Sequence, residues 1–344
     1  MSADAPLAAD NRLLQAGLLK KILSRPEFGS IIGAIAVFVF FSAFTENFFS
    51  IKAVSAYTNP GSTLGIMSVA IALLMIGGEF DLSSGVLIGG LGITTALLIQ
   101  NAGAPIWLAM LLSLALAIGV GVFNGVMVIK TKLPSFIVTL GTYFILQGAG
   151  LGFTRLISGQ TTIYLSEKLA GHNIAKTLFA SAPFAGIRIP VFYWLVITAL
   201  STFILLRSKY GNWIFSAGGN AAAARAVGVP VNKVKIALFV NVSVSAWLVA
   251  MFNTLRFQSA QIGVGVGMEF EFIIAAVIGG CLLTGGYGSA IGAAIGALIF
   301  EMVRQGLAFG RWDADWFKLF LGVMLLGAAL LNQYVRIRAE KARS

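Results

Sequence analysis

Cysteine, histidine and charge are scarce in this sequence, and each scarcity removes a class of function. The chain of 344 residues has one cysteine, Cys281, and one histidine, His172. A single cysteine excludes an internal disulfide, and one residue of each type cannot form the Cys/His sets that hold structural zinc. Charged residues make up 11% of the chain, against about 25% in an ordinary soluble domain.

The sequence motifs of common enzymes are missing as well. The dipeptide Gly-Lys never occurs, so the G-x-x-x-x-G-K-[ST] phosphate cradle of a P-loop ATPase is excluded. Neither G-x-S-x-G nor H-E-x-x-H appears. We therefore expect no ATPase site, no metal site and no cofactor in this chain, and a transport or scaffold role instead of catalysis.

Long apolar runs are what the sequence has in abundance. Hydrophobic residues make up 58% of the chain, which also contains 26 phenylalanines and 40 glycines. Several windows of about twenty residues hold almost no charge, which is the length needed to cross a hydrocarbon core about 30 Å thick. The predicted fold class is therefore all-α, a polytopic membrane helical bundle.

Ten such windows predict about ten transmembrane segments, with broken or re-entrant helices among them. The windows are residues 29–49, 58–77, 83–100, 105–129, 134–156, 189–206, 236–257, 270–284, 289–308 and 316–334. The window 270–284 is short, so it is either a span or a re-entrant segment. Together the windows predict one transmembrane domain over residues 29–334.

Basic residues are distributed unevenly between these windows. The segments predicted on one side are 1–28, the turn near 78–82, 130–133, 207–235, 285–288 and the tail 335–344, and they hold 15 of the 24 Lys and Arg residues. Such an excess marks the cytoplasmic side of a membrane protein. The net charge of +11 therefore indicates orientation, with both termini cytoplasmic, and not nucleic-acid binding.

The stretch IGGEFDLSSG, residues 76–85, places two carboxylates between two membrane-length windows. Polar residues at membrane depth are expensive and usually face the bundle interior or a water-filled path. Glu79 and Asp81 either cap a helix starting at Leu82 or line such a path, and the sequence favours neither interpretation. Glu301 and Arg304 share one helix face and are predicted to form a structural ion pair.

Two segments outside the membrane are long enough to meet partners. Residues 157–188 form a predicted external loop, and residues 207–235 form the longest internal segment on the basic side. Within the latter, Asn220 is suited to cap a short helix from Ala221 to Val227, which Gly228 would end. This helix is too short and too polar to span, so it indicates a contact role.

Glycine spacing predicts close helix packing, although some pairs arise by chance in so glycine-rich a chain. The pairs four residues apart in apolar windows are Gly85 and Gly89, Gly121 and Gly125, Gly148 and Gly152, and Gly292 and Gly296. A weak internal echo links residues 76–90 and 278–293, where Gly-Gly, a small polar turn and a glycine-spaced helix follow one another. Duplicated halves around a central path leave such correspondences.

Four motifs together resemble one family. GGEFDLSSG is followed by KTKLPSFIVTLGT (130–142), SAGGNAAAARAVGVPVNKVK (216–235) and EFEFIIAAVIGGCLLTGGYGSAIGAAIGALI (269–299). This order, over residues 55 to 335, is similar to that in the membrane permeases of bacterial ABC importers for ribose, xylose, arabinose and related monosaccharides. The family's first motif more often has a single acid, GG-x-D-L-S-x-G, so Asp81 matches it and Glu79 is an addition. Cys281 and Leu283 stand where the family commonly has small or polar residues.

The resemblance implies partners that this chain does not supply itself. Two permease copies would form a homodimer and would sit over two cytoplasmic ATPase subunits that bind ATP and Mg²⁺. A periplasmic sugar-binding protein would dock outside, and the bilayer would be the bacterial inner membrane. The loop 207–235 becomes the cytoplasmic coupling loop in this interpretation, and 157–188 the periplasmic loop.

Functional residues follow from the same resemblance. The ATPase coupling helix would comprise Gly218, Gly219, Asn220, Ala221, Ala222, Ala223, Ala224, Arg225, Ala226, Val227 and Gly228. The path for a neutral sugar would be lined by hydrogen-bonding and aromatic side chains, namely Glu79, Asp81, Asn124, Phe136, Thr139 and Thr142. Closure of the ATPase dimer would then alternate access to this path.

Two other functions compete with this one. An ion-coupled secondary carrier would titrate Glu79, Asp81 or Glu301 and would need no ATPase. A membrane scaffold or lipid-modifying enzyme is the third candidate, and the absence of nucleophile–base and metal clusters argues against it.

Overall fold

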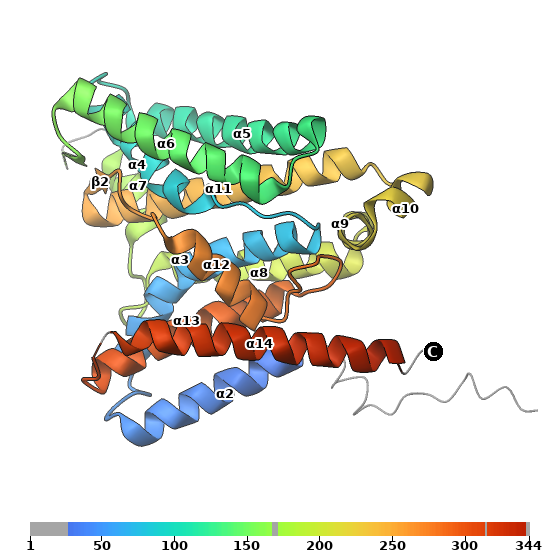
Figure 1. Cartoon of the computed structure of the whole chain (residues 1–344). Coiled ribbons are helices and arrows are strands. Elements are labelled where there is room, and N and C mark those ends of the chain that lie inside the picture. The colour runs from blue at the N-terminus through green and yellow to red at the C-terminus, as the bar shows by residue number, and fades with distance from the viewer. Residues whose placement is uncertain (1–26, 167–170, 314, 342–344) are drawn as a thin grey trace, which may run out of the picture.

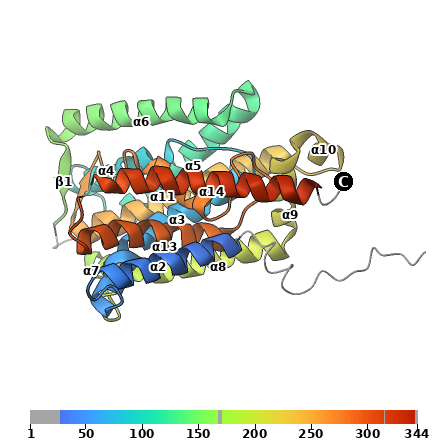
Figure 2. The same ribbon diagram turned by 60° about the horizontal axis from the view of Figure 1, so that its bottom comes forward.

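The computed structural model describes residues 27–166, 171–313 and 315–341, leaving out the side chains at 328–329 and 331–341. It contains a bundle of helices that run side by side in two views (Figures 1 and 2). The elements are α2 (Glu27–Phe44), α3 (Ile51–Ile76), α4 (Ser84–Gln100), α5 (Ile106–Thr131), α6 (Ser135–Ser158), β1 (Thr162–Tyr164), α7 (His172–Ala180), α8 (Ile189–Arg207), α9 (Lys209–Gly219), α10 (Ala221–Ala226), α11 (Val231–Phe257), β2 (Ser259–Gln261), α12 (Met268–Ile278), α13 (Ala290–Phe309) and α14 (Trp316–Lys341). The predicted all-α membrane bundle is confirmed.

Helices stand at all ten windows that the sequence marked, but they are not ten equal spans. Seven helices among the described residues are long and apolar enough to cross a membrane: α2, α3, α5, α6, α8, α11 and α13. Helix α4 and the apolar part of α14, Trp316–Gly327, are shorter. Helix α12 has only eleven residues, so a full helical span over 270–284 is wrong. A short helix followed by the irregular segment 279–288 stands there instead.

The molecule has two distinct ends (Figure 1). At one end, here called the α10 end, lie α9, α10, the α5–α6 connection and the C-terminal end of α14. At the opposite end, the hairpin end, β1 pairs antiparallel with β2 beside α7. The segments predicted to be cytoplasmic and rich in Lys and Arg therefore gather at the α10 end, apart from residues 1–26, which lie outside the described residues. Helix α14 continues to Lys341, so the described part of the predicted tail 335–344 is helical.

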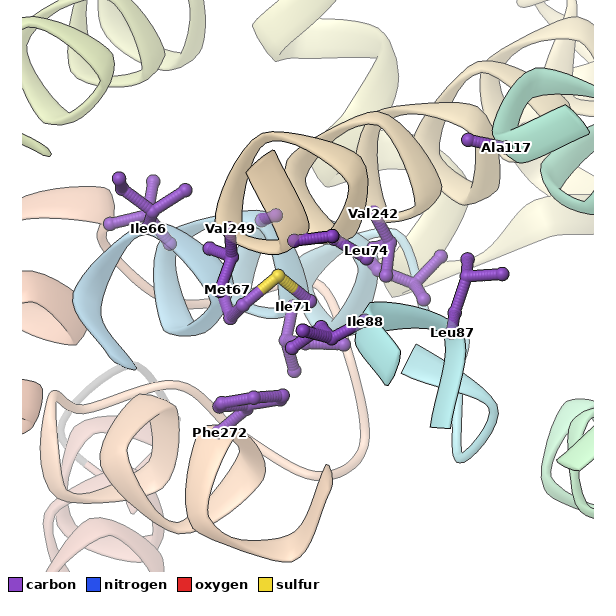
Figure 3. Packing of buried hydrophobic residues seen from close by; sticks show 14 of the residues in the cluster. Ile66, Met67, Ile71, Leu74, Leu87, Ile88, Ala117, Val242, Val249 and Phe272 are labelled. Carbon is purple, nitrogen blue, oxygen red and sulfur yellow. The ribbon is translucent and has the colours of Figure 1, made fainter. Parts of the chain in front are cut away.

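Helix α3 forms the centre of the bundle. Most of its residues are buried, and it packs against α8, α11, α12 and α13. Figure 3 shows its side chains Met67 and Leu74 beside Val249 and Val242 from α11, with Phe272 from α12 on the side of Ile71. Burial of an apolar helix on all sides is what a run without a polar face predicts, and it gives the neighbouring helices a rigid surface.

Three of the four glycine pairs mark close backbone contacts. A methyl group on Gly121 would lie 2.7 Å from the Cα of Val240, and one on Gly125 would lie 2.9 Å from the Cα of Ile236, so α5 rests directly on the backbone of α11. Gly292 and Gly296 of α13 pack in the same way on the backbone of α12, and Gly85 and Gly89 of α4 pack on the loop that precedes α12. Gly148 and Gly152 of α6 face no described atom within 4 Å.

The two segments linked by the internal echo meet at the α10 end. The N–H of Gly286 donates to the carbonyl of Ile76 at 2.9 Å, which ties the segment 279–288 to the end of α3. Gly218, near the end of α9, lies against both Ile76 and Gly286 so closely that a Cβ would clash with their backbones. Because only glycine fits, three backbones touch at this point, which we call the glycine junction.

The turn predicted near 78–82 begins at the α10 end, but it is a buried irregular segment and not a short surface turn. Residues 77–83 run as an irregular segment from the glycine junction into the protein, and Asp81, Ser83 and Ser84 are fully buried. The segment replaces part of a helix at membrane depth, where non-helical backbone persists only if the protein satisfies its polar groups. We call residues 77–83 the first break and 279–288 the second break.

The packing of α5 on α11 makes a prediction about two glycines on one helix. Gly121→Ala forces the Val240 backbone to move, and overpacking of this kind typically costs about 1–3 kcal/mol. Gly119→Ala is the matched control, because nothing lies within 4 Å of its position and alanine favours helix. Thermal unfolding in detergent micelles should show a lower midpoint for Gly121→Ala only. Equal midpoints for the two variants would refute the contact.

Candidate functional site

A chain of buried hydrogen bonds joins the first break to α5 and α6. The Asp81 carboxylate accepts from the N–H and hydroxyl of Ser83 at 2.8 and 2.6 Å through one oxygen, Oδ1. Asn124 on α5 donates to the Ser83 hydroxyl at 3.0 Å and accepts from the Thr142 hydroxyl on α6 at 2.7 Å. Asp81, Ser83 and Asn124 are fully buried and Thr142 is 5% exposed. We call these four residues the Asp81 network.

The backbone of the first break is held by hydroxyl groups from α6. The N–H of Phe80 donates to the Ser135 hydroxyl at 2.9 Å, and the N–H of Leu82 donates to the Thr139 hydroxyl at 3.0 Å. Ser135, Thr139 and Thr142 recur at four and three residues, so they lie on one face of α6. Ser83 and Ser135 are not among the residues predicted from the sequence, although the spacing on α6 was a signal for Ser135.

Neither carboxylate of the first break caps α4 in the predicted way. Helix α4 begins at Ser84, and its N-cap residue Ser83 makes no side-chain cap bond. The Asp81 carboxylate accepts from the N–H of Ser83, just before the helix, and so closes the turn 81–83. Glu79 forms an ion pair with Lys235 near the start of α11. The capping interpretation is therefore wrong for Glu79. Its charge is balanced at the α10 end, where the first break meets α11.

In this conformation, the six predicted path residues divide into two groups. Asp81, Asn124, Thr139 and Thr142 bond to one another or to the break, and Glu79 is bound to Lys235, with at most 7% of any of them exposed. Phe136 differs, because 51% of it is exposed on the side of α6 that faces away from the bundle. As it stands, the hydroxyl donors of the network are used within the protein, whereas Asp81 Oδ2 is a buried oxygen without a hydrogen-bond partner among the described residues.

The ion pair expected between Glu301 and Arg304 is present and has a third member. Arg304 donates to Glu301 at 2.8 Å and to Glu271 of α12 at 2.7 Å. Its guanidinium also lies over the rings of Phe300 and Phe317, 4.9 and 4.8 Å from their centroids. Arg304 thus joins α12, α13 and α14. We call Glu271, Glu301 and Arg304 the Arg304 cluster. The sequence identified the i,i+3 pair and missed Glu271, because α12 lies about thirty residues away along the chain.

The short helix predicted in the segment 207–235 is α10. Asn220 caps it by accepting from the N–H groups of Ala222 and Ala223 at 3.1 and 3.0 Å. Gly228 follows the helix with a φ of +85°, a conformation that favours glycine. Most of α10 is exposed, and Val227 just beyond it is 79% exposed. An ordered helix with an uncovered face at the end of a bundle is suited to contact another protein.

Comparison with known proteins places these features in a family. Residues 53–329 match the family described as "Branched-chain amino acid transport system / permease component". The chain belongs to this permease family. The match covers α3 to α13 and part of α14, and with them both breaks, α10 and the Arg304 cluster.

Similar proteins share nearly the whole length of this permease. The "Probable ABC transporter permease protein YphD" of Escherichia coli K12 is 30% identical over 327 residues, which are 94% of this chain and 95% of the relative. The autoinducer 2 import permease LsrD of Klebsiella pneumoniae is 30% identical, over 79% of this chain and 81% of its own. The ribose import permease RbsC of E. coli K12 is 29% identical, over 88% and 92%. No solved structure matches the chain.

The Asp81 network yields a prediction that separates a structural role from path lining. Thr142→Val removes the bond to Asn124 and leaves a buried amide oxygen unpaired, a change that typically costs about 1–3 kcal/mol. Thr94→Val is the control, because the Thr94 hydroxyl donates only to the carbonyl of Gly90 in its own helix. We expect a lower thermal midpoint in micelles for Thr142→Val and little change for Thr94→Val. An unchanged midpoint with lost transport would instead assign Thr142 to the path.

Proposed function

We propose that this permease is the membrane subunit of an ABC importer that carries a neutral monosaccharide or related polyol across the bacterial inner membrane. Separate ATPase subunits supply the energy, since the sequence has no phosphate-binding loop. The ribose and autoinducer 2 import permeases among its relatives support this class of substrate. The competing carrier function has less support, because Glu79 and Glu301 are each bound to a basic side chain.

The observation that carries the proposal is the connection of α10 to both breaks. Helix α10 is exposed at the α10 end and follows directly on Gly218 and Gly219, the last residues of α9. Gly218 touches the end of α3, before the first break, and Gly285 in the second. A push on α10 by an ATPase subunit is therefore delivered to the two irregular segments of the bundle, where the backbone is most easily rearranged.

A second copy of the chain is the partner that we propose within the membrane. Arg304 and Glu271, at membrane depth, have side chains that are 33% and 22% exposed. Lipid is a poor cover for charged groups, which usually face a bundle interior or a water-filled cavity. On α6, Gly148, Gly152 and Phe136 are uncovered as well. A homodimer that covers the charged groups in place of lipid, around a sugar path, accounts for their partial exposure.

The hairpin end is then the periplasmic side and the docking site for a sugar-binding protein. The predicted external loop 157–188 supplies β1 and α7 to this end, and the hairpin ties the loop to α11 through β2. High affinity resides in the binding protein, so the permease itself needs only a weak site. Alternation of access follows when ATP closes the ATPase dimer at the opposite end.

Coupling is tested by two proline substitutions in α10. Ala223→Pro removes an N–H that bonds to Asn220 and breaks the helix, whereas Ala221→Pro stands at the first helical position, which tolerates proline. With ATPase subunits and binding protein present, we expect Ala223→Pro to assemble but to lose at least about tenfold in uptake and stimulated ATPase activity, a barrier change of about 1.4 kcal/mol. Ala221→Pro should keep both. Normal uptake and stimulated ATPase activity in Ala223→Pro would refute the coupling role.

Orientation is tested by labelling introduced thiols on intact cells. The native Cys281 is buried, so single cysteines at exposed positions report cleanly. Tyr164→Cys, at a position 71% exposed on the hairpin end, should react with a membrane-impermeant maleimide that has passed the outer membrane. Val227→Cys, at a position 79% exposed beside α10, should react only after the inner membrane is permeabilised. The reverse pattern would exclude an ATPase contact at α10.

A further inference from the structure

A second polar site lies away from the Asp81 network, in a pocket of about 400 Å³ near the hairpin end. Helices α4 and α11 form two of its walls, and the β1–β2 hairpin with the loop after it forms the third. The residues that line it are Ile88, Gly89, Gly92, Thr162, Ala250, Asn253, Thr254, Phe257, Ser259, Ala260, Gln261 and Val264. Its volume falls within the range of small-molecule sites, about 300–1,000 Å³.

The pocket is a built feature of the fold. A Cβ on Gly89 would lie 2.5 and 2.6 Å from the carbonyl oxygens of Ile262 and Val264, so the loop rests on α4 only because this residue is glycine. A Cβ on Gly92 would lie 2.8 Å from the Thr254 hydroxyl and would occupy the space beside it. The paired strands hold the remaining wall in register, with Thr162 opposite Gln261.

The pocket contains hydrogen-bonding groups that the protein leaves unused. Thr254 is 3% exposed, yet its hydroxyl bonds to no group in the described part of the chain. Threonines of other helices behave differently, because the Thr94 and Thr198 hydroxyls donate to carbonyls four residues earlier. Buried polar groups are nearly always paired with protein, water or ligand. The Thr254 hydroxyl therefore points to an occupant of the pocket.

Four more polar side chains line the same space. Thr162, Asn253, Ser259 and Gln261 have no side-chain hydrogen bond to another described residue. Hydroxyls and amides both donate and accept, which matches the hydroxyl groups of a polyol. No charged side chain lines the pocket, and Arg256 next to it lies over the ring of Phe257, 4.8 Å from its centroid. The lining thus suits a neutral ligand and gives no partner to a carboxylate or an ammonium group.

We propose that this pocket, centred on Thr254 and Asn253, is a binding site for a neutral polyhydroxylated ligand, a monosaccharide or polyol, on the entry side of the permease. The assignment rests on the proposed import function and adds a site that the sequence analysis did not include. Discontinuous helices often form the substrate sites of transporters. Here the ligand meets α4, which follows the first break, and the loop before α12, the helix that leads into the second break.

Ligand binding to the purified permease tests the site directly. Saturation-transfer NMR in detergent micelles, with D-ribose, D-xylose, D-glucose and glycerol as probes, detects weak binding. We expect a signal from at least one probe for the unchanged chain. Thr254→Val and Asn253→Leu should each weaken it by about fivefold or more, since each removes hydrogen bonds to the ligand. Thr94→Val, outside the pocket, should leave it unchanged.

Two outcomes would overturn the proposal, and both are distinguishable from a failure of the import function. This pocket would be excluded if no probe gave a signal, or if Thr254→Val and Asn253→Leu left the signals unchanged. Either result would exclude it even where the assembled transporter still takes up sugar. Binding of L-leucine instead of the sugars would also exclude it, because the zwitterion needs charged partners. Uptake of L-leucine but no sugar by the assembled transporter would refute the import function itself.

Discussion

Backbone polar groups at membrane depth must be satisfied inside the protein, and much of this structure follows from that constraint. An unpaired N–H in the hydrocarbon region costs several kcal/mol, so a chain that interrupts its helices there needs partners close by. The first break finds them in the hydroxyls of Ser135 and Thr139 and in the turn closed by Asp81. Helix α6 has few other buried residues, so a large part of its attachment consists of these bonds.

The same constraint explains how a short surface helix can influence the membrane interior. A helix that spans without interruption resists local change, because each residue is bonded four residues along. The two breaks lack that ladder, and both reach the glycine junction beside α10. Motion applied to α10 therefore meets the two segments whose backbone is not held by a continuous helical ladder of hydrogen bonds. The ion pair of Glu79 with Lys235 adds a link between the first break and α11 at the same end.

Polar groups within the bundle fall into three sets with different chemistry. In the Asp81 network the hydroxyl and amide groups pair with one another and only Asp81 Oδ2 has no partner among the described residues, which is suited to holding a conformation. The Arg304 cluster is charged and partly exposed, which is suited to an interface that excludes lipid. The pocket around Thr254 near the hairpin end is lined by neutral polar side chains without hydrogen bonds to other described residues, which is suited to a ligand. Among the described residues, the third set offers a sugar several neutral donors and acceptors in this conformation.

The sequence by itself determined the membrane class, the positions of the helices and the short helix after Asn220, because hydrophobic runs and caps are local signals read over a few residues. It also placed Asp81, Asn124, Thr139 and Thr142 together as candidates through the family resemblance. Tertiary structure alone decided that these residues pair with one another, that Glu79 belongs to Lys235, and that Glu271 joins Arg304. It also decided that Thr254 faces a pocket beside the hairpin. These contacts join residues tens to more than a hundred positions apart, and no periodicity along the chain encodes which helix will pack against which.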